Sequence, residues 1–131
     1  DDDVESEPFD FTLRVAHDIP IVLTGGPSGS VNRGALAVLD GDGFLEPNEG
    51  SVEARFTGEF TPEDGSPSAV DSILPVSIAE FGDRTRGLVR LGAGVGGIQP
   101  GTFVGTIQLE STLIFGGAPT SSAPFDTTLR F

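Results

Sequence analysis

The chain has 131 residues, of which 20 are acidic and 7 are basic, so its formal net charge at pH 7 is −13. This charge disfavours nucleic acid as a partner, because phosphate binding needs a basic surface, and it disfavours docking on an anionic membrane. The chain also contains 19 Gly, 10 Pro and no Cys. Gly and Pro at this density disfavour a helix-rich fold, and the absence of cysteine excludes a disulfide scaffold and a cysteine-ligated zinc finger.

The first eight residues, DDDVESEP, carry five acidic side chains and little that could be buried. We expect this stretch to be an acidic leader outside the folded domain. The sequence begins at Asp1 without a methionine, and no apolar run reaches the roughly 20 residues that a membrane helix needs. We therefore expect no membrane insertion, and an extracellular or cell-surface protein from which a signal peptide has been removed.

Alternation of apolar and polar residues predicts strands along the rest of the chain. Phe9, Phe11, Leu13 and Val15 alternate with polar residues, which is the pattern of a half-buried strand. Further strands are expected at 19–24, 35–39, 52–60, 73–81, 87–91, 103–115 and 125–131. Gly58 is expected to weaken the strand 52–60, because it has no side chain to pack.

Turns rich in glycine and proline separate these segments, and no segment shows a sustained helical period. Seven to nine short strands with such turns between them predict an all-β fold, an immunoglobulin-like antiparallel β-sandwich. The length fits a single domain, which we expect to span residues 9–131, with 9–15 as a strand that could be donated to a neighbour.

The strongest local motif is VLDGDGFLEPNE at residues 38–49. An EF-type calcium loop takes ligands from positions 1, 3, 5, 7, 9 and 12 and has Gly at position 6. The expected ligands are the carboxylates of Asp40, Asp42, Glu46 and Glu49 and the carbonyl group of Phe44. Val38 cannot supply the first carboxylate, so Ca²⁺ is expected to bind weakly, with a Kd on the order of 10⁻⁴ to 10⁻³ M. The alternative is an Asp-Gly turn with solvated carboxylates.

Residues 38–49 resemble EF-hand and dockerin loops, apart from the missing first ligand. Residues 40–49, DGDGFLEPNE, more closely resemble the acidic D-G-D-G-x-L-E-P-x-E loops at the start of immunoglobulin-like modules in bacterial secreted proteins. This resemblance implies a calcium-stabilised accessory or adhesion module of a larger secreted protein.

No group of residues predicts a reaction. Gly92, Gly94 and Gly97 have the glycine spacing of a dinucleotide-binding loop, but Pro100 prevents the helix that must follow. His17 is the single histidine, and no G-x-S-x-G nucleophile motif accompanies it. A carboxylate pair for glycoside hydrolysis stays open, although Trp and Tyr, which line many sugar-binding clefts, are absent. We expect no enzyme activity and no organic cofactor.

The two ends of the chain carry nearly the same sequence. FDFTLRV at residues 9–15 and FDTTLRF at residues 125–131 agree at five of seven positions in the same register. Both segments place their apolar residues on one face, so both could fit one groove. Either two strands of one domain share a facing pattern, or the N-terminal segment is donated to the sheet edge of a neighbouring subunit.

This arrangement resembles chaperone–usher pilins, in which an N-terminal strand of one subunit completes the sandwich of the next. Their C-terminal strand ends in an alternating aromatic run, as APFDTTLRF does in this chain, whereas the cysteine pair frequent in those pilins is missing. The residues expected to mediate assembly are Phe9, Phe11, Leu13, Val15, Phe125, Leu129 and Phe131. The resemblance implies a head-to-tail homopolymer, an extracellular filament, and leaves open whether an export chaperone takes part.

Overall fold

The computed structural model describes residues 20–80, 82–96, 99–114, 116 and 118–131. Its strands are β1 (Val22–Gly25), β2 (Gly29–Ser30), β3 (Leu36–Asp42), β4 (Gly50–Pro62), β5 (Ser68–Ile78), β6 (Arg86–Arg90), β7 (Gly101–Leu113), β8 (Thr120–Ser121) and β9 (Phe125–Arg130). A single turn of 3-10 helix spans Ala93–Val95. The prediction of an all-β fold with seven to nine strands is confirmed for these residues. None of the helical structure in them is long and apolar enough to cross a membrane.

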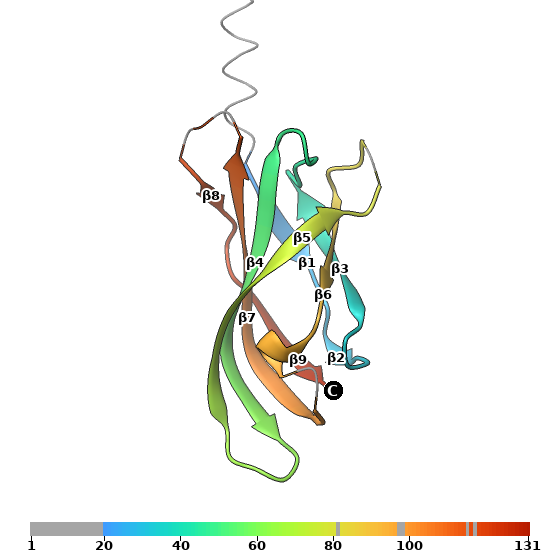
Figure 1. The fold of residues 1–131 in the computed structure, drawn as a ribbon, viewed down its shortest axis with the longest axis vertical. Coiled ribbons are helices and arrows are strands. Elements are labelled where there is room, and N and C mark those ends of the chain that lie inside the picture. The colour runs from blue at the N-terminus through green and yellow to red at the C-terminus, as the bar shows by residue number, and fades with distance from the viewer. Residues whose placement is uncertain (1–19, 81, 97–98, 115, 117) are drawn as a thin grey trace, which may run out of the picture.

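The strands form one strongly curled sheet in the order β1-β3-β6-β5-β4-β7-β9-β2, with β8 paired to β7 (Figure 1). β2 and β9 run parallel, whereas the other paired strands are antiparallel. The expected purely antiparallel arrangement is therefore wrong at β2. The reason is that the chain continues from β1 into β2 and pairs first with β3 at one edge and then with β9 at the other.

β5 joins the two halves of the curled sheet, so the strand pairing does not show two separate facing sheets. Its residues 68–76 pair with β4, and Ser77 and Ile78 pair with β6. Pro75, which has no N–H group, lies where β5 pairs with β4 alone. β5 also begins at Ser68, earlier than the expected residue 73. The sequence did not predict residues 68–72 as part of the strand, because Val70 is the one buried side chain among them and the alternation there is weak.

β4 and β7 are the longest strands, and they pair along their whole length of 13 residues. Gly58 does not interrupt β4, because it lies directly opposite Gly105. A Cβ atom on Gly58 would stand 2.2 Å from the carbonyl oxygen of Val104, and one on Gly105 would stand 2.1 Å from that of Thr57. The two glycines therefore permit a backbone approach that no other residue allows at this point.

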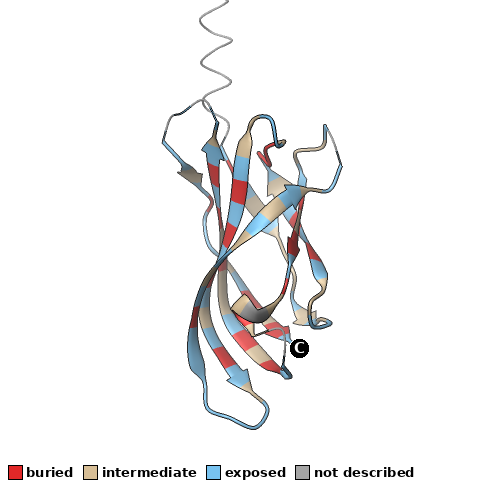
Figure 2. Ribbon diagram, viewed as in Figure 1, coloured by how far each residue is buried: buried red, intermediate tan, exposed pale blue. Residues whose placement is uncertain are grey.

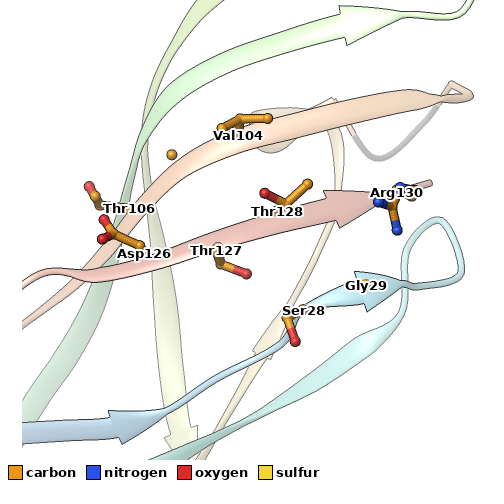
Figure 3. A pocket seen from close by; sticks show the side chains of 9 residues that line it. Ser28, Gly29, Val104, Thr106, Asp126, Thr127, Thr128 and Arg130 are labelled. Atoms are coloured by element: carbon orange, nitrogen blue, oxygen red, sulfur yellow. The ribbon is translucent and has the colours of Figure 1, made fainter.

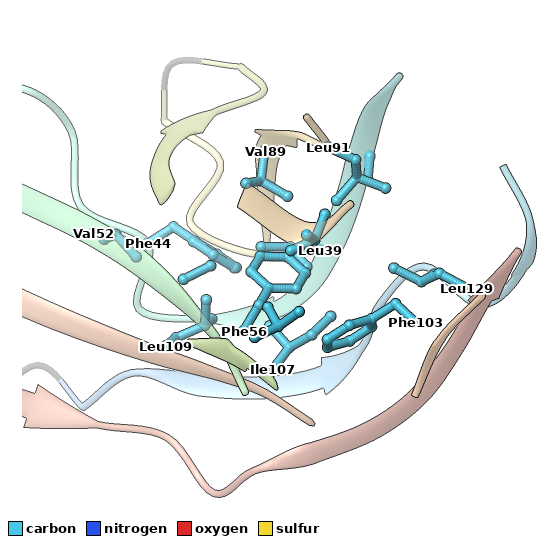
Figure 4. Packing of buried hydrophobic residues seen from close by; sticks show 14 of the residues in the cluster. Leu39, Phe44, Val52, Phe56, Val89, Leu91, Phe103, Ile107, Leu109 and Leu129 are labelled. Carbon is cyan, nitrogen blue, oxygen red and sulfur yellow. The ribbon is translucent and has the colours of Figure 1, made fainter. Parts of the chain in front are cut away.

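The concave side of the sheet holds the hydrophobic core. Buried and exposed residues alternate along the strands (Figure 2), as in β4, where Ala54 and Phe56 are buried and Arg55 is exposed. The largest fully buried side chains are Phe44, Phe56, Phe103, Leu39, Leu91, Ile107, Leu109, Leu129, Val89 and Val95. Figure 4 labels all of these except Val95. Phe56 and Phe103 meet edge to face, with ring centroids 6.1 Å apart. Ile21 and Leu129, which lie near the two ends of the described chain, belong to this one core.

Candidate functional site

Residues 38–42 of the expected calcium loop belong to β3, and residues 43–49 connect β3 to β4. This connection contacts the turn that precedes β6. The backbone N–H of Phe44 donates to the carbonyl oxygen of Arg84 at 3.2 Å, and the N–H of Gly82 donates to Glu46 Oε2 at 2.7 Å. Gly43 has a φ of +88°, which favours glycine, and a Cβ atom there would lie 2.1 Å from the Pro20 carbonyl oxygen. This turn directs the fully buried Phe44 ring into the core.

Glu49 and Arg84 form a two-pronged ion pair between these loops. Arg84 Nη1 donates to Glu49 Oε1 and Nη2 donates to Oε2, and Oε1 also accepts the N–H of Glu46 at 2.9 Å. The side chains of Arg84 and Glu49 are 35% and 27% exposed, so the pair is partly shielded from water. Hydrogen bonding to Arg84 lowers the pKa of the Glu49 carboxyl from its ordinary 4.5, and the same bond raises the pKa of Arg84.

The remaining acidic residues of the loop have partners of their own. Asp42 Oδ1 accepts the N–H of Gly43 at 2.8 Å, and Asp40 Oδ1 lies 3.7 Å from Nε of Arg86. In the described part of the chain, no three carboxylate or imidazole side chains come together as metal ligands. This arrangement does not fit the expected calcium shell of Asp40, Asp42, Phe44, Glu46 and Glu49. Calcium binding itself stays a prediction.

Sequence reasoning missed Arg84, which lies 35 positions from Glu49. The available signal was the clustering of three of the seven arginines at 84, 86 and 90 in an otherwise acidic chain. Such clustering indicates a local counter-charge, but it does not say which carboxylate receives it.

The C-terminal residues expected to mediate assembly belong to the chain's own sheet. β9 pairs with β7 from Phe125 to Arg130. Leu129 is fully buried, and Phe125 and Phe131 pack against the core, with the Phe131 ring centroid 6.3 Å from that of Phe60. The N-terminal members of the expected set, Phe9, Phe11, Leu13 and Val15, lie outside the described residues.

β9 leaves part of its other edge open. β2 pairs with β9 at Leu129 and Arg130 alone. The backbone N–H and carbonyl groups of Phe131 both bond to Gly101 on the β7 side. Hydrogen-bonded and non-hydrogen-bonded pairs alternate along an antiparallel ladder, so the backbone groups of Arg130 and Asp126 point away from β7. The Arg130 carbonyl oxygen accepts the N–H of Val31, whereas Asp126 lies beyond the β2 pairing. The link between β1 and β2 also runs beside this part of β9, where the Thr127 hydroxyl group donates to the Pro27 carbonyl oxygen.

An open groove of about 520 Å³ lies over the outward-facing side of β7 and β9 and extends to Ser28 and Gly29 (Figure 3). Its lining comprises Ser28, Gly29, Val104, Gly105, Thr106, Asp126, Thr127, Thr128 and Arg130. Asp126 is the single carboxylate in this lining, so the groove lacks the pair of carboxylates on which glycoside hydrolysis depends. Apolar atoms make up most of its lining surface.

A second two-pronged ion pair lies on the exposed face of β4 and β5. Arg55 donates to Asp71 Oδ1 at 2.8 Å and to Oδ2 at 2.9 Å, and the side chains are 54% and 57% exposed. Hydrogen bonding to Arg55 lowers the pKa of Asp71. This pair has the same chemistry as Glu49 and Arg84, but water screens it more strongly.

Comparisons with protein-family models, with curated proteins and with solved structures find no match.

Proposed function

We propose that this chain is a structural subunit of an extracellular filament, in which residues 9–15 of one subunit pair with the sheet edge of the next. The observation that carries this proposal is the open edge of β9 at Asp126, beside the groove of about 520 Å³. Strand addition at such an edge gains affinity from main-chain hydrogen bonds and register from alternate side chains. Because this head-to-tail contact does not close on itself, it extends into a filament.

The sequence of the donated segment supports this pairing. Residues 9–15 share five of seven positions with residues 125–131, which contain β9, and both segments alternate apolar and polar side chains. A second strand with this pattern could lie beside β9 with its apolar residues on the core side. The same alternation would leave its Asp, Thr and Arg side chains on the outer face.

We also propose that the curled sheet is an immunoglobulin-like sandwich whose halves β5 joins. In that fold, strands A-B-E-D form one sheet and C-F-G form the other. The order β1-β3-β6-β5 followed by β4-β7-β9 corresponds to those two sheets. β1 and β2 would then be two parts of the first strand, one at each edge.

The second candidate is an accessory or adhesion module of a larger secreted protein. The burial of Leu129 and the packing of Phe125 and Phe131 favour it, because the described residues build their core without a strand from another chain. Such a module would be monomeric, and the 131-residue chain would then have a mass of 13.5 kDa in solution. Molecular mass in solution therefore distinguishes the two candidates.

The experiment compares the full chain with a deletion of residues 1–15, using size-exclusion chromatography with light scattering. The full chain should form assemblies larger than 13.5 kDa, and the deletion should be monomeric, because it lacks the segment proposed to pair with a neighbour. A peptide of residues 7–17 should bind the deletion monomer in calorimetry. The same peptide with Phe11→Asp should not bind, whereas the peptide with Thr12→Ser should.

The acceptor edge is tested in the deletion monomer. Asp126→Pro removes an N–H group that points away from β7, so peptide binding should be lost while the β7 ladder stays intact. Asp126→Ala is the matched control, because it keeps the N–H group and should bind the peptide. A full chain that remains monomeric at high concentration would overturn the filament proposal in favour of the module.

A further inference from the structure

Four carboxylates lie within ten residues at positions 40–49. Like charges this close raise the free energy of the folded chain unless a cation lies among them. In the structure, a guanidinium group lies there: Arg84 binds both oxygens of Glu49. Electrostatic attraction from Glu46 and Asp42 also reaches Arg84 and contributes to its raised pKa.

We propose that Arg84 is the resident cation of the acidic loop, so that the folded chain holds this loop in place without calcium. The arginine fork binds a carboxylate through two parallel N–H···O bonds, a geometry that a lysine ammonium does not form. The backbone also fixes its position, because the Arg84 carbonyl oxygen accepts the Phe44 N–H at 3.2 Å. Arg84 is thus anchored to the loop both by its backbone and by the end of its side chain.

Calcium would have to compete for oxygens that already have partners. Both oxygens of Glu49 bind Arg84, and Oε2 of Glu46 accepts the N–H of Gly82 at 2.7 Å. A metal ion bound to these two carboxylates would compete with the hydrogen bonds that connect the loop to the turn before β6. A guanidinium in this position therefore makes the loop independent of calcium.

This inference does not depend on the filament proposal, because it concerns stability within one subunit. The test is thermal unfolding of the full chain in millimolar calcium and in chelator. The wild-type melting temperature should agree to within about 1 °C in the two solutions, whereas a site at ten times its Kd would raise it by several degrees. A rise of several degrees in calcium would overturn the proposal.

Arg84→Gln should lower the melting temperature by roughly 5 °C or more, because it leaves Glu49 without its partner. Arg55→Gln is the matched control: it makes the same charge change in a two-pronged pair that is 54% and 57% exposed, and it should cost less than about 2 °C. Equal effects of the two substitutions would contradict the special role of Arg84.

A double-mutant cycle with Glu49→Gln separates this role from general charge effects. Arg84→Gln should cost much less in the Glu49→Gln background than in the wild type, since the pair is already broken. Additive effects would overturn the proposal. If Arg84→Gln does not fold, Arg84→Lys serves in the same cycle, because lysine keeps the charge but loses the fork geometry.

Discussion

The hydroxyl group of Thr127 donates a hydrogen bond of 2.5 Å to the carbonyl oxygen of Pro27, although the two residues lie 100 positions apart. Thr127 is a buried residue of β9, and Pro27 belongs to the link between β1 and β2. Together with the pairing of β2 and β9, this bond connects the two ends of the strand order. It is also adjacent to the groove proposed to accept a neighbouring strand.

Thr127→Val should destabilise the chain by about 1–3 kcal/mol, because it keeps the shape of the side chain but leaves the Pro27 carbonyl group without its donor. The measurement is the free energy of unfolding from urea denaturation of the deletion monomer. Thr127→Ser is the control, since it retains the hydroxyl group and should cost clearly less. If valine is tolerated as well as threonine, the bond does not stabilise the fold.

Leu129→Ala should lower the free energy of unfolding of the deletion monomer by about 2–5 kcal/mol, because it leaves a cavity at a fully buried position. The exposed neighbour Arg130 is the control, and Arg130→Ala should change stability by no more than about 0.5 kcal/mol. If Leu129→Ala leaves the free energy of unfolding unchanged, Leu129 of β9 does not stabilise the core of its own chain.

The sequence predicted the long strands well, because half-buried strands have a period of two that is visible locally. It could not predict β2 and β8, since each has two residues and is defined by pairing with β9 or β7. It also could not show that Gly105 lies opposite Gly58, because local propensity does not reveal cross-strand partners. Pairing across the sheet decides whether a glycine weakens a strand or permits it.

Gly58→Ala tests this cross-strand relationship. The added Cβ atom would stand 2.2 Å from a carbonyl oxygen on the paired strand, so β4 and β7 must separate, and we expect a loss of more than about 2 kcal/mol. Gly92→Ala is the control, because no atom lies within 4 Å of the Cβ position there. That substitution should be neutral or stabilise by up to about 1 kcal/mol. Equal effects in urea denaturation would contradict the role of the glycine pair.

The acidic loop shows a different limit of sequence reasoning. The density of carboxylates at 40–49 predicted a counter-charge beside the loop, and Arg84 pairs with Glu49 there. Its source could not be read from the loop, because Arg84 reaches Glu49 only after β3, β6, β5 and β4 have paired. The motif is local, whereas the partner of its last carboxylate is set by the topology of the sheet.

The lowered pKa of Glu49 predicts a specific dependence of stability on pH. Because the folded-state pKa lies below the ordinary value of 4.5, the unfolded chain binds the proton more readily than the folded chain between the two values. The contribution of the pair is therefore fully present above the unfolded-state pKa, and it is lost as the pH falls through the folded-state pKa.

The free energy of unfolding of the wild type should exceed that of Glu49→Gln near pH 7, and the difference should shrink as the pH falls below 4.5. Arg84→Gln should remove most of this pH dependence, because hydrogen bonding to Arg84 is the main cause of the lowered pKa. The measurement is urea denaturation at several pH values. If the difference in free energy of unfolding between wild type and Glu49→Gln stays constant over this pH range, the ion pair does not contribute to stability.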